Sequence, residues 1–204
     1  DVYVAMAGAI KKFDKDGNHL GTFFGYKEIE GYEIDPVHLA LDQNEQYLHV
    51  TGRDHIAKFD ATNFNYIERW GEFGHSPCQL WSTAGIAIDN TGNIYVSDAG
   101  NHQISKFDSS GNCQLGWGSY GTGNGEFNLP AGIAIDDSGN VFIADRHNYR
   151  VQMFDSSGNF LAKWGTHGSE NGQFGLPRAV AVDHSGDIYV GDATSRVQKF
   201  TFGN

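Results

Sequence analysis

The stretch PAGIAIDDSGNVFIADRHNYRVQMFDSSGNFLAKWG, residues 130–165, decides the fold because most of it occurs a second time in the chain. The segment TAGIAIDNTGNIYVSDAGNHQISKFDSSGNCQLGWG, residues 83–118, aligns with it without a gap. Four short apolar stretches each end in an aspartate, and these aspartates are spaced 47 residues apart, at Asp42, Asp89, Asp136 and Asp183. Self-similarity at a fixed period of this length is typical of solenoids, propellers and other repeat arrays.

One period contains four segments of strand length, GIAID, NVFIAD, RVQMFD and FLAKWG. DSG separates the first two and SSGN the last two, and these residues favour tight turns. Each copy is therefore predicted to be a four-stranded antiparallel sheet. Its strands carry apolar residues on both faces, such as Ile133 and Ile135 against Ala134, so both faces require cover. Radial stacking of such sheets gives a β-propeller, and 27 glycines against 4 prolines agree with an all-β fold.

The longer segment GNGEFNLPAGIAIDDSGNVFIADRHNYRVQMFDSSGNFLAKWG resembles the NHL repeat, which is named for an Asn-His-Leu type of triplet after the second strand. The corresponding triplets here are NHQ at 101–103, NYR at 148–150 and a shortened TSR at 194–196. The resemblance implies a propeller of four-stranded blades, and propellers of this family usually close with about six blades. Because the motif is structural, it specifies the fold far better than the function.

The strand pattern predicts one domain over residues 1–204, with three complete blades between two partial ones. The predicted spans are a partial blade at 1–25, blades at 37–71, 84–118 and 131–165, and a partial blade at 178–202. The first partial blade begins in a second strand, and the last ends after a third strand. Three alternatives follow: part of a larger ring, a five-bladed variant with unusual closure, or a ring completed by association with another copy. Open strand edges and apolar faces pair readily with another chain.

The loops between second and third strands are predicted to emerge on the same side as the connections between blades, and we call this side the loop rim. Residues there differ between copies whereas the surrounding strands do not, which makes the loop residues available for binding. The predicted partner-binding residues are Arg53, His55, Trp81, Asn101, His102, Arg146, His147, Tyr149 and Arg178. Trp, Tyr and Arg dominate interface energetics, so the expected anchors are Trp81, Arg146, Tyr149 and Arg178. The alternative is that these are ordinary solvated loop residues.

Three aspartates, Asp98, Asp145 and Asp192, recur at the same place in successive copies. We expect each to hold the adjacent loop through side-chain hydrogen bonds to the backbone. The two cysteines, Cys78 and Cys113, are too few for a disulfide framework and lack metal-ligand spacing. Cys113 takes the place of a phenylalanine in the next copy, so we expect a buried small hydrophobe there. Cysteine usage leaves the redox compartment undecided. The expected location is secreted or extracellular, with the cytoplasm as the alternative.

Composition limits the function classes. The net charge of −11 opposes phosphate-driven binding of nucleic acid. No apolar run reaches the roughly 18 residues that a membrane span needs. No nucleophile is visibly paired with a base and no histidine pair has ligand spacing, so the sequence assigns no catalytic residue, metal site or cofactor. The resemblance allows calcium or zinc, because some enzymes of similar fold hold these ions in the propeller channel.

The leading prediction is a noncatalytic binding scaffold that recognises a protein or peptide partner through the loop rim. A metal-dependent lyase or hydrolase with a site at the channel mouth is the second alternative. RNA recognition is the third, because the NHL domains of some tripartite-motif proteins read RNA hairpins, and the acidic charge weakens it. Self-assembly through the open blade edges is the fourth.

Overall fold

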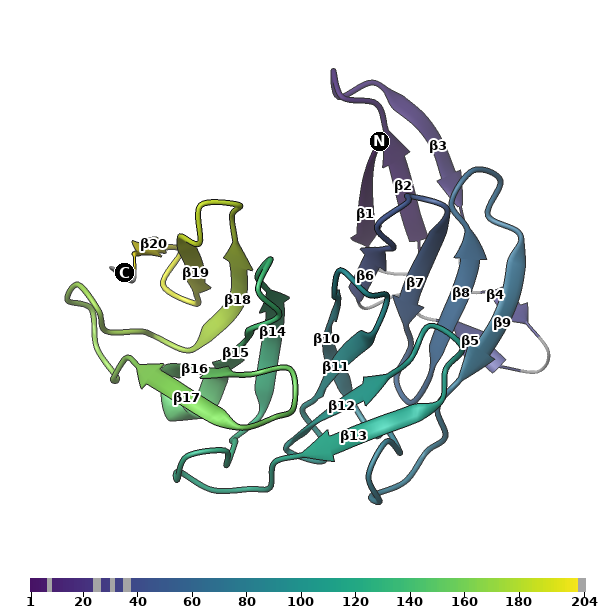
Figure 1. Ribbon diagram of the computed structural model, residues 1–204. Coiled ribbons are helices and arrows are strands. Elements are labelled where there is room, and N and C mark those ends of the chain that lie inside the picture. Colours follow the sequence, from purple (N-terminus) through teal and green to yellow (C-terminus); the bar gives the residue numbers. More distant parts are fainter. Residues whose placement is uncertain (7–8, 24–26, 30–31, 35–37, 202–204) are drawn as a thin grey trace.

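The computed structural model describes residues 1–6, 9–23, 27–29, 32–34 and 38–201 (Figure 1). This part of the chain is built from short strands and one 3-10 turn, η1 (Arg146–Asn148). The strands are β1 (Val2–Met6), β2 (Ala9–Phe13), β3 (His19–Phe23), β4 (Lys27–Ile29), β5 (Tyr32–Ile34), β6 (His38–Leu41), β7 (Tyr47–Thr51), β8 (Ile56–Asp60), β9 (Tyr66–Trp70), β10 (Thr83–Ile88), β11 (Ile94–Asp98), β12 (Gln103–Phe107), β13 (Cys113–Trp117), β14 (Pro130–Ile135), β15 (Val141–Asp145), β16 (Arg150–Phe154), β17 (Phe160–Trp164), β18 (Pro177–Val182), β19 (Ile188–Asp192) and β20 (Val197–Phe200). Across the described residues, no helix is long and apolar enough to cross a membrane.

Five antiparallel sheets follow one another along the chain and are arranged in an arc (Figure 1). The first sheet contains β1–β3, and the next three contain four strands each, β6–β9, β10–β13 and β14–β17. The last sheet contains β18–β20, and β4 and β5 form a separate hairpin. The first sheet has no inner strand and the last has no outer strand among the described residues. The predicted all-β propeller with three complete and two partial blades is therefore confirmed.

The turns inside the blades are organised by one aspartate side chain each. Asp108 Oδ1 accepts the backbone N–H groups of Ser110 and Asn112, both at 2.9 Å, and Gly111 supplies the φ of 80° that the turn needs. The Asn112 side chain donates to the other carboxylate oxygen at 2.8 Å. This bond and the backbone donors lower the pKa of Asp108. The same pattern at Asp14 shows that the segment DKDGN is one of these turns.

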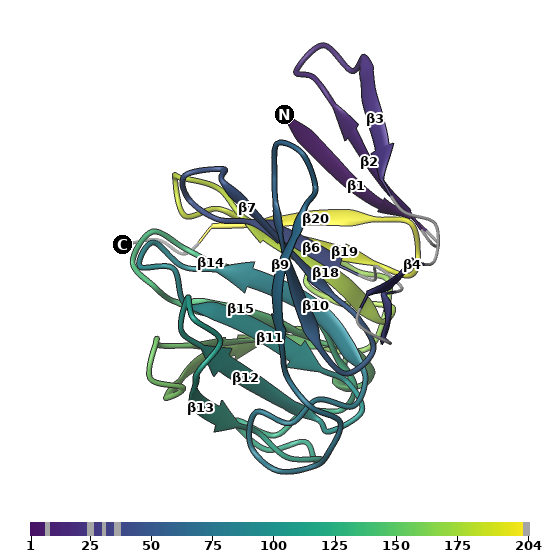
Figure 2. The same cartoon turned by 90° about the vertical axis from the view of Figure 1, so that its right-hand side faces the viewer.

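The inner wall of the arc is made by the first strands of the blades, β6, β10, β14 and β18, each packed against the next. Seen from the side, the first sheet projects from the body that the other four sheets form (Figure 2). The loops and turns lie at the two ends of the sheets, because every blade is a meander of antiparallel strands. This arrangement leaves two surfaces free to vary, the loop rim at one end and the shorter turns at the other.

The described hydrophobic core consists of four layers, each between two neighbouring sheets. In the layer between the third and fourth sheets, Tyr95 and Ile104 of the third sheet meet residues of the fourth, Ile133, Ile143 and Phe154. None of these side chains is more than 7% exposed. Each inner sheet therefore uses one face for the preceding blade and the other for the following blade.

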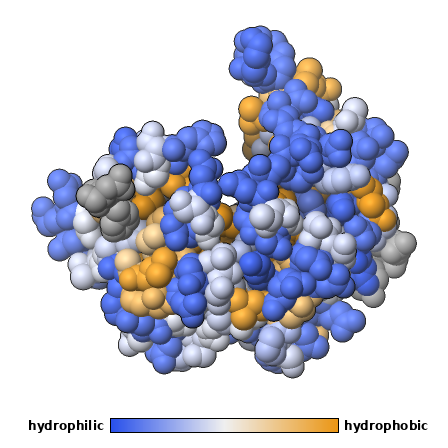
Figure 3. Space-filling model, viewed as in Figure 1, coloured by the Kyte–Doolittle hydropathy of each residue, from blue (hydrophilic) through white to orange (hydrophobic). Residues whose placement is uncertain are grey.

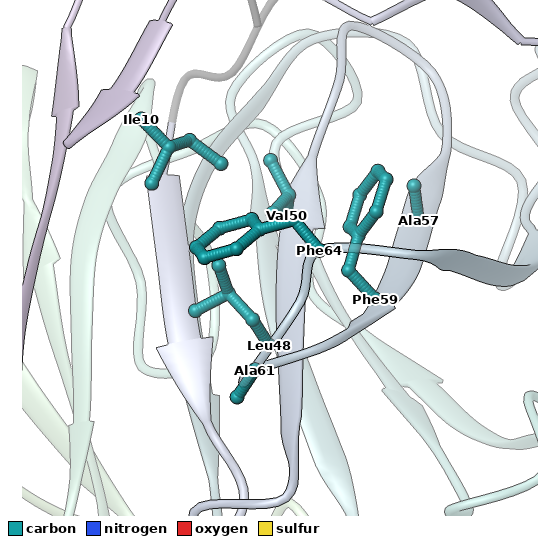
Figure 4. Close-up of a cluster of buried hydrophobic side chains, with 7 residues drawn as sticks. All are labelled: Ile10, Leu48, Val50, Ala57, Phe59, Ala61 and Phe64. Carbon is teal, nitrogen blue, oxygen red and sulfur yellow. The ribbon is translucent and has the colours of Figure 1, made fainter. Parts of the chain in front are cut away.

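The first sheet is joined to the second by a layer of the same kind (Figure 4). Ile10 of β2 packs with Leu48 and Val50 of β7. Phe64, from the turn between β8 and β9, stacks on Phe23 with ring centroids 3.6 Å apart. One face of the first sheet is thus covered.

Within the described part of the chain, no further sheet packs on the opposite faces of the two end sheets. By their register with the adjacent strand, Val2 and Val4 occupy the positions that Ile94 and Val96 hold in the third sheet. Ile94 and Val96 are fully buried, whereas Val2 and Val4 are 52% and 40% exposed. Val197, in the last sheet, is 69% exposed. The space-filling view shows a notch between the two end sheets, with apolar residues on the side of the first (Figure 3).

A disulfide bond joins Cys78 to Cys113, with Cα atoms 5.8 Å apart. Cys78 lies in the connection that leads into the third sheet, and Cys113 begins β13, the outer strand of that sheet. The expectation of a buried small hydrophobe at Cys113 is wrong, because this position on the outer strand is exposed. The bond ties the blade connection to the outer edge of the blade.

Removal of the disulfide should destabilise the protein. In the chain-entropy treatment, a cross-link across a loop of this length contributes about 3 to 4 kcal/mol to the free energy of unfolding. We expect Cys78→Ser combined with Cys113→Ser to lower the urea midpoint and to raise the slope, because the denatured state without the cross-link exposes more surface. Chemical reduction of the parent chain should shift the midpoint equally. Coinciding urea curves for oxidised and reduced protein would contradict this account.

The uncovered end faces should make the chain self-associate as its concentration rises. Val2→Glu combined with Val4→Glu places charge on one such face, so association should be lost while the free energy of unfolding changes by no more than about 0.5 kcal/mol per site. Light scattering coupled to size exclusion measures the mass. The matched control is Val96→Glu, which buries an unpaired charge at the equivalent position and should unfold the protein. A parent chain that stays monomeric at every concentration would exclude this behaviour.

Candidate loop-rim binding surface

The register of the sheets places the variable loops and the blade connections at one end of the propeller. Thr83 at the start of β10 pairs with Asp98 at the end of β11, and Pro130 pairs with Asp145 in the next sheet. The connection that enters each of these blades therefore lies beside the loop that leaves its second strand. The loop rim predicted from the sequence is formed in this way.

The framework of the loop rim is held by the recurring aspartates. Asp98 is fully buried and accepts the backbone N–H groups of Trp81 and Ser82 in the incoming connection, at 2.9 and 3.1 Å. Asp145 accepts the N–H of Asn128 at 2.8 Å and pairs with the Arg150 guanidinium at 2.7 Å. The predicted structural role of these aspartates is confirmed.

Asp192 repeats this role in the last sheet. Burial acts to raise its pKa, but the Thr194 hydroxyl and the backbone N–H of Gly175 donate hydrogen bonds that outweigh burial and lower the pKa to about 2. The carboxylate is therefore ionised at neutral pH and serves as an anchor for the chain around it.

Asn101 belongs to the same framework. Its side-chain amide donates to the carbonyl oxygens of Gly74 and Gln79, at 2.8 and 3.2 Å, and to Asp98 at 2.8 Å. Its Oδ1 lies 2.7 Å from Nδ1 of His75. The N–H groups of Asn101 are thus used inside the protein, and its neighbour His75 is the exposed side chain at this point.

Aromatic side chains form a repeated feature of the loop rim. The rings of His102 and Tyr120 lie 5.1 Å apart, and those of Tyr149 and His167 lie 4.4 Å apart. His102 and Tyr149 hold the same position in consecutive copies, with φ of 56° and 54°, and Tyr120 and His167 are likewise 47 residues apart. Tyr120 is 69% exposed. Two blades therefore present the same kind of aromatic pair to solvent.

A third aromatic cluster lies in the blade connection one period earlier in the sequence. Phe73 occupies the position of Tyr120 one period earlier and is 59% exposed. His75 contacts both Phe73 and Trp81, with ring centroids 5.9 and 5.1 Å apart. Trp81 is 38% exposed. Sequence reasoning missed Phe73, Tyr120 and His167, although an aromatic ring at 47-residue spacing in each connection was the available signal.

The other predicted partner-binding residues differ in how exposed their side chains are. Arg53, His147 and Arg178 are exposed, and Arg146 is half-buried. His55 is only 3% exposed and its Nδ1 lies 2.9 Å from the Asp54 carboxylate, so it lies beneath the surface of the rim. The structure thus combines exposed cationic side chains with exposed aromatic rings on one side of the molecule.

His102 acts as a hydrogen-bond acceptor at the loop rim. Burial lowers the pKa of His102, and its Nδ1 accepts the backbone N–H of Leu129 at 3.1 Å. The proton of the neutral ring is therefore on Nε2, which leaves that nitrogen as a donor. Burial likewise lowers the pKa of His38 at the start of β6. Within the described ranges, no three His, Cys, Asp or Glu side chains are grouped so that they could hold a metal ion.

A cavity of about 290 Å³ lies at the loop rim beside the second sheet, lined by Asp54, Arg69, Gly71, Glu72 and Phe73. Its wall is mainly charged, with one exposed aromatic ring. This composition suits polar contacts with a segment of another molecule.

Comparison with known proteins identifies the repeat. The NHL repeat family matches residues 81–107 and 127–154. No curated protein is similar enough in sequence to count as a match. A structural genomics protein of unknown function from Bacteroides thetaiotaomicron superposes with a TM-score of 0.75 at 17% identity, over 97% of this chain and 55% of its own.

Two lyases are similar in fold. A streptogramin B lyase superposes with a TM-score of 0.66 at 12% identity, over 97% of this chain and 63% of its own. The virginiamycin B lyase of Staphylococcus aureus superposes with a TM-score of 0.66 at 10% identity, over 98% of this chain and 65% of its own. The chain spans 55 to 65% of the length of these three proteins, and identities this low concern the fold alone.

The two matched stretches correspond to consecutive copies, each running from a blade connection through the third strand of the blade. The remaining sheets repeat the same strand order and the same aspartate turns. The chain therefore carries NHL repeats at residues 81–107 and 127–154, within an all-β propeller of five sheets.

Proposed function

We propose that the protein is a noncatalytic binding scaffold that recognises a protein or peptide partner through the loop rim. The observation that carries this proposal is the repeated exposed aromatic pair, His102 with Tyr120 and Tyr149 with His167. Exposed aromatic rings on a rigid framework offer large contact area at a low entropic cost, and Tyr and Trp are common anchors of interfaces.

The charges of the loop rim support a partner with acidic as well as apolar side chains. Arg53, Arg146 and Arg178 lie on this side, although the chain as a whole carries a net charge of −11. Arginine pairs well with carboxylates and stacks on aromatic rings. A peptide that alternates aromatic and acidic residues fits this mixture.

A second candidate function, assembly, rests on a different observation. Val2, Val4 and Val197 are exposed although their positions are buried in the inner sheets. Faces of this kind bind another blade, which makes the chain one unit of a larger ring or array. The loop rim would then be presented in several copies, so assembly and partner binding are compatible.

The disulfide bond supports a compartment proposal. A stable bond between Cys78 and Cys113 requires an oxidising environment, such as the outside of the cell or the periplasm. We place the protein in such a compartment, where its partner would also be found.

The proposal can be tested with peptides that are selected for binding to the protein itself. A random peptide library is displayed on phage, binders are selected on the immobilised chain, and their Kd is measured by calorimetry. Tyr120→Ala combined with Tyr149→Ala should weaken binding about 100-fold, because removal of an interface anchor costs about 2 kcal/mol or more. The melting temperature should stay nearly unchanged, since the framework hydrogen bonds are untouched.

The matched control is Leu161→Ala, which removes another large exposed side chain, on the outer strand β17, away from the loop rim. It should leave the Kd unchanged. Selected peptides that bind the double tyrosine variant as tightly as the parent would sink the proposal, as would a selection that yields no binder.

A further inference from the structure

A cavity of about 420 Å³ lies between the second and third sheets, at the end opposite the loop rim. Its walls come from the turns after β6, β10 and β12 and from the facing strands β7 and β8. The lining residues that matter here are Asp42, Tyr47, His49, Lys58, Ile88 and Asn90. This volume is in the range of small-molecule sites.

One buried side chain in the wall of this cavity differs between copies. By register, His49 holds the position of Tyr95 in the third sheet and Tyr189 in the last. Tyr95 fills its layer and donates its hydroxyl to Asp89 at 3.2 Å, and Tyr189 does the same to Asp183 at 3.0 Å. An imidazole is shorter than a phenol, so His49 leaves more of the corresponding space open than Tyr95 does. The cavity one blade further on measures about 240 Å³.

His49 is buried without a hydrogen-bond partner. The residue is 3% exposed, and neither ring nitrogen is bonded to any atom of the described chain. Its ring contacts the edge of Trp70, with centroids 5.7 Å apart. Buried polar atoms in native proteins are nearly always paired, and an unpaired one costs about 1 to 3 kcal/mol. His49 is also one of the residues that line the cavity, so the cavity lies beside this unpaired ring.

The protonation state of His49 defines what that partner must be. Burial, followed by the charge of Lys58, lowers the pKa of His49 to about 4. At neutral pH the ring is uncharged and offers one N–H donor and one nitrogen acceptor. A group that both accepts and donates a hydrogen bond, such as a hydroxyl, satisfies it best.

The charges around the cavity are already compensated. Lys58 Nζ pairs with Glu68 at 3.2 Å and lies 4.5 Å from the ring centroid of Tyr47. The Asp42 carboxylate accepts the backbone N–H groups of Gln46 and Tyr47 at 2.7 and 2.8 Å. An anionic ligand would therefore find no free cation, and a cationic ligand no free carboxylate.

The remaining wall combines amide and hydroxyl groups with apolar surface. Gln43 and Asn90 are joined by a hydrogen bond of 2.6 Å between the two sheets. Ser109 and Ser110 add hydroxyl groups, and Ile88 adds an apolar patch. Such a lining matches a compact molecule that carries several hydroxyl groups on a carbon ring.

We propose that this cavity binds a neutral polyhydroxylated small molecule of the monosaccharide or cyclic polyol class, with His49 as its buried hydrogen-bond partner. The site is independent of the loop rim, since it lies at the other end of the sheets and shares no residue with it. A negative result for ligand binding in this cavity would therefore not contradict partner binding at the loop rim, and the reverse also holds.

The experiment is a calorimetric and saturation-transfer NMR titration of the full chain with glucose, galactose, mannose and myo-inositol, and with citrate as the anionic comparison. At least one neutral compound should bind and raise the melting temperature. His49→Tyr fills the cavity as in the third sheet and should weaken binding at least tenfold. His49→Phe keeps an aromatic ring but removes both nitrogens and should have the same effect, which keeps the test valid if one variant folds poorly.

The matched control is Tyr120→Ala at the loop rim, which should bind the neutral compound as the parent does. Binding by no neutral compound of the panel would overturn the proposal. Preference for citrate would also overturn it, as would equal binding by both folded His49 variants.

Discussion

Every part of this structure depends on one constraint, which is that its sheets carry apolar side chains on both faces and water must be excluded from both. Two neighbouring residues of β11 show this, since Ile94 packs toward the preceding sheet, Tyr95 packs toward the following one, and both are fully buried. No blade can meet the constraint alone, so copies cover one another. The arc of sheets, the core layers and the open end faces are consequences of this.

Because packing fixes the strands, the differences between copies gather where packing is relaxed. At the loop rim, buried aspartates such as Asp98 hold the connections while aromatic and cationic side chains beside them vary. Between the second and third sheets, where His49 stands in place of a tyrosine, the cavity is larger than between the third and fourth sheets, where Tyr95 stands. The same framework thus supports two separate surfaces without a change of fold.

The sequence was informative where interactions are local. The blade strands, aspartate turns and blade number follow from patterns within a few residues and from their repetition, and were predicted, whereas the hairpin of β4 and β5 lies outside the repeat and was not. The bond between Cys78 and Cys113 and the pairing of Tyr149 with His167 join segments that meet only after folding. His55 was expected on the rim surface, but the N–H of Gly52 bonds to the carbonyl of His55 and extends the strand pairing, which leaves His55 buried. The cavity could not be predicted, because it depends on how the turns and side chains of two neighbouring sheets pack.

The most direct test of the central claim is hydrogen exchange of the native protein, followed by mass spectrometry at a dilution where the chain is monomeric. If cover on both faces is what stabilises a blade, the amides of β10–β13 and β14–β17 should exchange only through global unfolding. The amides of β1–β3, which are covered on one face, should exchange faster through local opening. Equal protection of the first sheet and the inner sheets would contradict the account.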